Sequence, residues 1–296
     1  MRTIKYLLLT ATVLTIFSCD NSLEVSEPSF DVSTDKSVYK INDTVRFNFS
    51  GDVEYLTFYS GDSGHEYKHK ERTEIEEAKP VLTFTSSGRY GPPERNLSLL
   101  VATNFSGAMN ADAIKAANWK DISDKVNFSA GTVVQSGPID VSEFTKDAQV
   151  HFAFKYVGIG NTPQPQKTWS ITELSLKTYD PSGKVFPLFD NLSQAGWLQF
   201  SVEGATRSWR ITATELWLGA NPNEPSNEDW VISKAVNLAA INPDKGVPLK
   251  TLTASLEPLT YSYKFAGEYV VTFVAKNQSI YGEKEVIKEI HITITE

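Results

Sequence analysis

The stretch that most constrains the fold is 149–177, where apolar and polar residues alternate. A period of two is typical of a strand that buries one face in a core. A loop rich in Gly, Pro and Asn divides the stretch into two such runs, which indicate two long strands in the middle of a β-sandwich. The first run places a large apolar residue at every second position, namely Val150, Phe152, Phe154 and Tyr156.

The second run changes phase partway along. Trp169 and Ile171 share one parity, whereas Leu174 and Leu176 fall on the other. An extra residue in one strand restores such a pattern, so we expect a β-bulge near Thr172–Glu173.

Composition agrees with a folded, strand-rich protein. The 296 residues suffice for roughly two domains, and 41% hydrophobic with 22% charged residues are ordinary globular values. Sixteen Phe, twelve Tyr and six Trp against two Met favour β structure, where aromatic rings fit a pleated surface.

The charge balance argues against two classes of partner. The net charge is −8, and removal of Arg2 and Lys5 with a leader would take it to −10. Nucleic-acid affinity depends on neutralising phosphates with basic residues, and the chain has no basic cluster. We therefore expect no nucleic-acid partner and no electrostatic attraction to an anionic membrane surface.

The N-terminus predicts export and a lipid anchor. Residues 1–19 show two basic residues, an apolar run and then Ser18-Cys19, typical of a secretory signal. The four residues 16–19 resemble a bacterial lipobox, in which Cys19 becomes the lipidated first residue; the alternative is a plain signal peptide with a chance cysteine. Cys19 is the only cysteine, so no disulfide can form within the chain. We interpret 20–27 as a short tether.

The order of strands predicts a split domain. The segment 28–72 offers about three strands, too few to bury a core alone, and the chain ends on a long alternating strand. We therefore expect 28–79 and 259–296 to form one immunoglobulin-like sandwich, with 80–258 inserted as a jelly-roll sandwich. Two tandem domains remain the alternative. The one convincing helix is Asn110–Trp119, with Asn110 or Asp112 as its cap.

Several short sequence segments resemble those of known domain families. AGEYVVTFVAKN at 266–277 and IKEIHITI at 287–294 resemble the closing half of a PKD-type immunoglobulin-like domain, and 38–62 resembles its opening half. With NADAIKAANWKDIS, SGPIDVSEF and NEDWVISKAVNL from the middle, the mature chain resembles a Bacteroidetes family of lipoproteins of unknown function found with outer-membrane glycan-uptake systems. The middle is also similar to jelly-roll, galactose-binding-like carbohydrate modules. The resemblance implies glycan binding by association only.

One motif points to a metal. His65-Glu66-Tyr67-Lys68-His69 matches H-E-x-x-H, the zinc peptidase signature, which needs both imidazoles on one helical face. Glycines precede it and no amphipathic helix follows it. We therefore interpret the motif as a charged strand of a hairpin, and expect no metal there.

The sequence does not favour hydrolysis, phosphate binding or nucleophilic catalysis. Glycoside hydrolysis needs two carboxylates facing across a cleft, and pairs such as Glu74–Glu77 or Glu224 with Glu228 are typical of solvated faces. The chain has no phosphate-binding glycine loop and no nucleophile elbow. We expect no cofactor; calcium, which jelly rolls often hold, stays an alternative.

Carbohydrate binding needs exposed aromatic faces with polar groups beside them. We expect such rings where aromatic residues adjoin turns, although each of these is more often packed in a core. The candidate rings are Tyr90, Trp197 and Trp209, and the candidate polar companions are Arg89, Arg207 and Asn191.

Taken together, these patterns predict a non-catalytic lipoprotein of the outer membrane, exposed at the cell surface. We expect it to bind a polysaccharide or oligosaccharide beside an outer-membrane transporter. The alternative is a structural protein that docks on a partner protein, and the remote alternatives are a glycoside hydrolase or a zinc peptidase.

Overall fold

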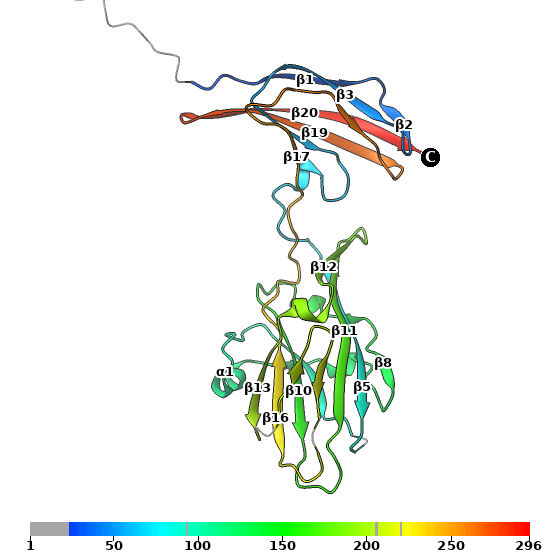
Figure 1. Cartoon of the computed structure of the whole chain (residues 1–296), viewed down its shortest axis with the longest axis vertical. Helices are drawn as coiled ribbons and strands as arrows, with labels where there is room; N and C mark the ends of the chain where they lie inside the picture. The colour runs from blue at the N-terminus through cyan, green and yellow to red at the C-terminus, as the bar shows by residue number, and fades with distance from the viewer. Residues whose placement is uncertain (1–23, 93, 205–206, 220) are drawn as a thin grey trace, which may run out of the picture. The chain divides into compact units, whose positions relative to one another are not determined.

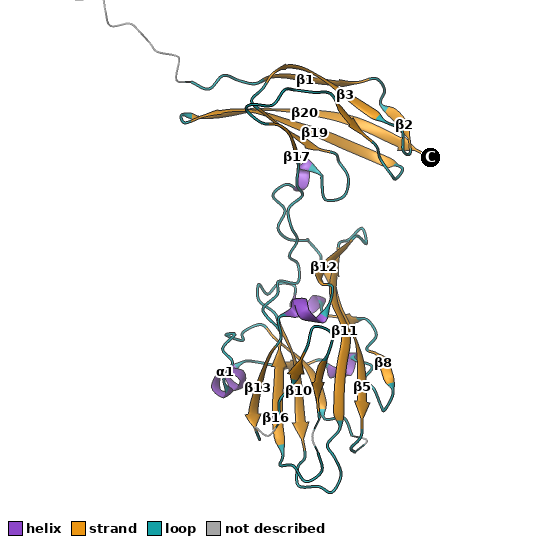
Figure 2. Ribbon diagram, in the orientation of Figure 1, coloured by secondary structure: helices purple, strands orange, loops and turns teal. Residues whose placement is uncertain are grey.

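A computed structural model describes residues 24–92, 94–204, 207–219 and 221–296. Strands make up 47% and helices 7% of these described residues, which form an all-β structure (Figure 2). Within the described ranges, no helix has the length and apolar character needed to cross a membrane. The predicted signal peptide and Cys19 lie outside the described residues.

The chain forms two compact units. One comprises the chain up to Arg72 together with Pro243–Glu296, and the other is the continuous segment Thr73–Asn242. The inserted unit thus starts earlier and ends earlier than the expected 80–258. The reason is that β17 (Val247–Lys250) pairs with β4 (Tyr55–Tyr59) of the first unit, whereas Ile75 packs on Ala239 in the second.

The first unit is a sandwich of two sheets. One sheet has the order β1-β3-β18 and the other β17-β4-β19-β20-β2. All pairs are antiparallel except β2 with β20, which is parallel. The strands not yet bounded are β1 (Ser29–Thr34), β2 (Val38–Lys40), β3 (Val45–Asp52), β18 (Leu259–Tyr261), β19 (Gly267–Ser279) and β20 (Gly282–Thr295).

A hydrogen bond near the start of β19 marks this unit as immunoglobulin-like. The hydroxyl of Tyr269 donates to the carbonyl oxygen of Phe265, four residues upstream, at 2.9 Å, which is the arrangement of the tyrosine corner in immunoglobulin folds. Val271, two residues on, is fully buried. The β17-β4-β19-β20 order also matches the corresponding sheet of that fold.

The core of the first unit joins the two segments of chain. Phe273 of β19 contacts the rings of Phe30, Phe47, Phe49 and Phe58 from the N-terminal segment, with ring centroids 5.2 to 6.2 Å apart. These four phenylalanines pack against β19, so the segment 24–72 depends on the C-terminal strands for its core.

The second unit is also a two-sheet sandwich (Figure 1). Its five-stranded sheet has the order β13-β16-β10-β6-β7, and its larger sheet β14-β15-β11-β5-β8, with β12 added beside β11 and β9 beside β5. The bounds in the first sheet are β13 (Leu198–Glu203), β16 (Asn227–Ile232), β10 (His151–Gly158), β6 (Leu97–Ala102) and β7 (Lys120–Asp121). Those in the second are β14 (Arg210–Ile211), β15 (Leu216–Leu218), β11 (Thr168–Tyr179), β5 (Lys79–Arg89), β8 (Val133–Gln135), β12 (Val185–Phe189) and β9 (Ile139–Asp140).

The helix α1 (Ala111–Ala116) covers the outer side of the five-stranded sheet. Asn110 caps it, because its side-chain oxygen accepts from the backbone N–H of Ala113 at 2.8 Å, and the predicted helix is thereby confirmed in a shorter form. Ile114 is buried against Trp230 and neighbouring residues of β16 and β10.

The expected strand pair and bulge are confirmed. β10 and β11 are the two long strands of 149–177, and they lie in different sheets around one core. The pairing of β11 with β5 shifts register between Thr172 and Ser175, and Glu173 has a φ of 51°. This local twist returns Leu174 and Leu176 to the core side.

Candidate functional site

The structure places the six predicted sugar-binding residues in different environments. Trp197 and Trp209 are only 7% and 3% exposed, whereas Tyr90 is 71% exposed. The polar residues Arg89 and Asn191 are exposed, and Arg207 is half-buried.

The two tryptophans are core residues, which corrects the expectation that they present a ring to a ligand. Trp197 packs on Phe154 with ring centroids 5.7 Å apart. The indole N–H of Trp209 donates to the carbonyl oxygen of Asp229 at 3.3 Å. Each follows a turn but enters the space between the two sheets, so neither ring face is available for a sugar.

Two of the polar candidates are engaged in local structure. The Arg207 guanidinium donates to both carboxylate oxygens of Glu224, with the shortest contact 2.9 Å, and these hydrogen bonds lower the pKa of Glu224. Asn191 caps the short helix η5 (Leu192–Ala195) by accepting from the N–H of Gln194. Both side chains therefore organise loops, and Asn191 lies apart from Tyr90, beside a different pocket.

Tyr90 occupies an unusual backbone conformation. Its φ is 60°, a region that bulky L-residues rarely adopt, and Gly91 follows with a φ of 66°. A Cβ at Gly91 would lie 2.5 Å from the backbone nitrogen of Lys167, so only glycine fits. The turn that carries the Tyr90 ring is thus held against the 165–167 backbone.

A pocket opens beside this turn. Its volume is about 250 Å³, slightly below the range usual for small-molecule sites. Its walls are mainly apolar, with amide, carboxylate and hydroxyl groups among them, and we call it the loop pocket. It is lined by Pro92, Glu94, Asn96, Val157, Ile159, Thr162, Pro165, Gln166 and Lys167.

Buried donors hold the polar groups of the loop pocket. The indole N–H of Trp169 donates to Asn96 Oδ1 at 2.7 Å. The Tyr156 hydroxyl lies 3.0 Å from Gln166 Oε1 and 2.9 Å from the Lys167 carbonyl oxygen. Burial raises the pKa of Tyr156, so this hydroxyl stays protonated. The amides of Asn96 and Gln166 are consequently fixed before any ligand arrives.

Close packing explains the glycine that ends β10 at this pocket. A Cβ on Gly158 would lie 1.8 Å from Gln166 Oε1. Glycine therefore lets the amide of Gln166 pack against the strand end, where its nitrogen donates to the Pro225 carbonyl oxygen at 3.2 Å.

A buried carboxylate lies behind the loop pocket. Asp229 pairs in register with Tyr156 across β16 and β10. It accepts a short hydrogen bond from the Ser201 hydroxyl and one of 2.5 Å from the amide of Asn227. Burial raises the pKa of Asp229. Because no basic group is among these partners, the carboxylate is compensated by neutral donors.

A second pocket, which we call the bulge pocket, lies on the outer face of the larger sheet. β11 pairs on one edge with β15 up to Ile171 and with β12 from Leu176, and the bulge lies between them. The volume is about 720 Å³. Its lining is Thr172, Glu173, Leu174, Ser175, Lys177, Asp190, Asn191, Leu192, Ala213, Thr214 and Glu215.

Two of the three carboxylates that line the bulge pocket, those of Glu173 and Glu215, already have partners. Glu173 accepts from the Thr85 hydroxyl at 2.7 Å. Glu215 accepts from the Ser170 hydroxyl at 2.6 Å and from the Arg210 guanidinium at 2.8 Å. No aromatic ring lines either pocket. The loop pocket differs in that it adjoins the turn that carries the exposed Tyr90.

Sequence reasoning missed one tryptophan on this face. Trp217 lies between the buried Leu216 and Leu218 and points to the opposite side of β15. The Arg210 guanidinium lies over its ring, 5.1 Å from the centroid. In a strand, the alternation of Leu216, Trp217 and Leu218 predicts that the tryptophan faces away from the two leucines, and this signal could have identified it.

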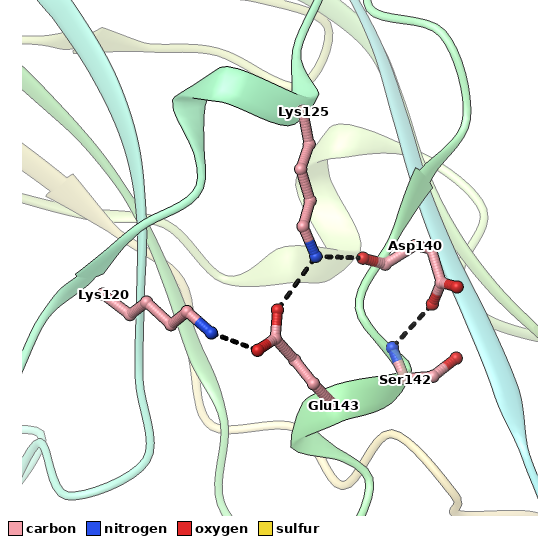
Figure 3. A network of polar contacts seen from close by, with 5 residues as sticks. All are labelled: Lys120, Lys125, Asp140, Ser142 and Glu143. Atoms are coloured by element: carbon pink, nitrogen blue, oxygen red, sulfur yellow. Dashed lines mark hydrogen bonds and ion pairs between the residues drawn. The ribbon is translucent and has the colours of Figure 1, made fainter.

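A polar cluster elsewhere on the second unit is structural (Figure 3). Glu143 accepts from Lys120 and Lys125, and Lys125 also donates to the carbonyl oxygen of Asp140 at 3.0 Å. These hydrogen bonds lower the pKa of Glu143. Both lysines and the carboxylate satisfy one another, and the cluster ties η3 (Ser123–Lys125) to η4 (Ser142–Phe144).

The His65–His69 motif does not form a strand, which corrects the hairpin interpretation. It is a loop that ends in the short helix η2 (Tyr67–His69). His65 Nδ1 lies 2.5 Å from the Lys245 carbonyl oxygen, and His69 Nε2 lies 3.6 Å from a Glu66 oxygen. Among the residues that the structure describes, no three His, Cys, Asp or Glu side chains gather as a metal site would require.

These observations define an all-β protein of two sandwiches, in which a rigid aromatic turn adjoins a small loop pocket. The chain matches the family model described as a domain of unknown function (DUF5017) over residues 18–197. More than half of the chain is covered, so the protein belongs to this family. No curated protein and no solved structure matches the chain.

Proposed function

We propose that the protein is a non-catalytic, lipid-anchored protein of the bacterial cell surface that binds polysaccharide. The observation that carries this proposal is the exposed Tyr90 ring, held on a rigid turn beside the loop pocket. The proposed role is accessory capture of glycan for uptake by an outer-membrane transporter.

The chemistry of the loop pocket suits a sugar. Pyranose rings present apolar C–H faces that stack on aromatic rings, while their hydroxyls need fixed donors and acceptors. Tyr90 offers the ring, and the held amides of Asn96 and Gln166 offer both donors and acceptors. Arg89, exposed beside Tyr90, adds a charged donor at the rim.

The proposed anchor rests on the N-terminal sequence. Cys19 follows an apolar run and is the only cysteine in the chain. Bacterial lipoproteins carry several acyl chains on such a residue, and each buried methylene contributes about 0.8 kcal/mol. Incorporation of radiolabelled palmitate into the wild-type chain, and its loss in Cys19→Ser, is the expected result in cells.

Affinity electrophoresis of the chain from residue 20 onward tests glycan binding. The gels contain plant, host or microbial polysaccharides, and retardation by at least one glycan is expected. Tyr90→Asn should abolish the retardation, because it removes the ring and leaves the turn. Tyr281→Asn, which removes a similarly exposed tyrosine from the first unit, is the matched control and should leave the retardation unchanged.

Two outcomes would contradict the proposal. Equal retardation of wild type and Tyr90→Asn would remove the site from the loop pocket. No retardation by any glycan, with no sugar release on long incubation, would favour the alternative of a structural protein that docks on a partner protein.

A further inference from the structure

The tip of the β19–β20 hairpin is an exposed apolar feature of the first unit. Its two turn residues, Ile280 and Tyr281, are 90% and 61% exposed. Neither residue has a positive φ; that conformation falls on Gly282, which follows them, so the backbone of the turn accepts any ordinary L-residue at both positions. The turn itself therefore does not explain why two large apolar side chains are placed in solvent.

The hairpin end projects beyond β4, and two polar contacts lie near its base. β4 pairs with β19 only between Thr272 and Lys276, so beyond this point β19 and β20 pair only with each other. Lys276 forms a cross-strand ion pair with Glu283 at 2.9 Å. The backbone N–H of Gln278 donates to Glu54 Oε2 at 2.7 Å.

The N-terminal tether leaves the first unit at this same end. The side-chain amide of Asn277 donates to the carbonyl oxygen of Ser26 at 3.1 Å. Figure 1 shows the start of β1 beside the projecting end of β19 and β20. Cys19 precedes Ser26 by seven residues, so it can reach at most about 25 Å from there, while the tip lies only about 10–13 Å beyond Asn277 along the strand.

We propose that Ile280 and Tyr281 form a second membrane contact, which inserts into the interfacial zone of the bilayer that holds the Cys19 lipid. The proposal rests on the lipid anchor of the proposed function. Tyrosine favours this zone because its ring is apolar and its hydroxyl is polar. The flanking charges, Lys284 with Glu283 and Glu285, are of mixed sign, so the contact suits a zwitterionic phospholipid surface.

The single cysteine makes a direct experiment feasible. The mature chain from Cys19 is produced without lipid and coupled through that thiol to a maleimide phospholipid in phosphatidylcholine vesicles. Tyr281→Trp places an indole at the tip. Phe265→Trp is the matched control, because Phe265 is 74% exposed and precedes β19 at the opposite end of the same sheet. Vesicles with brominated acyl chains quench tryptophan on contact.

We expect the emission added by Tyr281→Trp, relative to the wild-type chain, to be lost in brominated vesicles and shifted to the blue in ordinary ones. The emission added by Phe265→Trp should be unaffected. Adding Ile280→Ser to Tyr281→Trp should weaken the quenching. Matching thermal transitions of all variants would show that folding is unchanged.

Other outcomes would overturn the inference. An unquenched Tyr281→Trp indole on the coupled chain means that the tip stays in water, or contacts a protein partner instead. Equal quenching at both positions means that the unit lies on the membrane without a preferred end. The vesicle experiment attaches the lipid chemically, so its result does not depend on whether cells acylate Cys19. If cells do not incorporate palmitate at Cys19, the protein has no lipid anchor and the inference fails with the proposed function.

Discussion

At the scale of single residues, Tyr90 combines strain with exposure. A bulky side chain at positive φ costs roughly 1–2 kcal/mol, and such strain persists only where neighbouring structure holds it. The neighbours are Gly91 and the 165–167 backbone. The strain lowers the stability of the folded protein, and it is consistent with a function that requires the Tyr90 ring at this position.

Tyr90→Asn should therefore separate binding from stability. Asparagine tolerates positive φ, so we expect the free energy of unfolding to stay constant or rise by up to about 1 kcal/mol, while glycan retardation disappears. Urea unfolding followed by tryptophan fluorescence measures the first quantity. A marked loss of stability would mean that the ring packs against the protein, and that the turn is structural.

Asp229 is a buried acid whose raised pKa makes a prediction with a definite sign. Its ionised form is disfavoured by burial, so at neutral pH it reduces the stability of the folded state relative to the unfolded chain. The penalty is absent below the unfolded pKa of about 3.9 and grows as the pH rises through the higher folded pKa.

Asp229→Asn should consequently stabilise the protein at pH 7, by about 1 kcal/mol, the lower end of the cost of a poorly compensated buried group. The asparagine keeps an acceptor for the Ser201 hydroxyl, and the Asn227 amide can turn to match it. The gain should shrink as the pH falls toward 4, measured by thermal unfolding across that range. The exposed Asp190→Asn is the control and should show no gain; a destabilised Asp229→Asn would contradict the expectation.

At the scale of elements, the bulge in β11 decides how the larger sheet is used. Its extra residue shifts the alternation, so Trp169, Ile171, Leu174 and Leu176 all reach the core. The same irregularity leaves residues 172–175 between β15 and β12, where the bulge pocket forms. The bulge therefore both brings Leu174 and Leu176 into the core and forms the bulge pocket on the outer surface.

The tyrosine corner ties the loop before β19 to the strand. Tyr269→Phe removes the hydrogen bond to Phe265 and keeps the ring, so we expect a loss of about 1 kcal/mol. The loss should appear only in the unfolding of the first unit, followed by calorimetry. Tyr281→Phe at the exposed tip is the control. An unchanged transition in Tyr269→Phe would mean that water replaces the bond without cost.

At the scale of the whole molecule, the chain is a continuous unit inserted into a discontinuous one. The segment 73–242 has its own two-sheet core, whereas the N-terminal strands depend on β19 for theirs. The excised segment 73–242 should therefore fold alone, with the same midpoint temperature that its transition shows in the full chain.

Differential scanning calorimetry of the full chain should accordingly show two transitions, one of which the excised segment reproduces. The segment 24–72 alone should stay unfolded, because it lacks the strands that bury Phe47 and Phe58. A single transition in the full chain together with an unfolded excised segment would mean that the two units are not independent.

Much of this architecture was predictable from local pattern. A period of two, a slip in that period, and a capping asparagine before a short apolar helix each report backbone geometry within a few residues. The strands β10 and β11, the bulge at Glu173 and the helix α1 follow from these signals. Of the three candidate rings, Tyr90 is exposed, and its role in binding stays a prediction.

Other features depended on contacts between distant segments. Trp197, Trp209 and Tyr90 all adjoin turns, and only the position of the second sheet buries the first two. The pairing of β17 with β4 moved the domain boundary, and the contact of His65 with Lys245 accompanied a turn where a strand was expected.

The sequence by itself determined where strands run, where their alternation slips and where the helix begins, because short-range sterics and the burial of one face set these features. Only the tertiary structure decided which turn aromatics face solvent and which chain segments share a core. Pairing between distant segments, such as β17 with β4, leaves no periodic mark in either partner, so the boundary between the two units became visible only in the folded molecule.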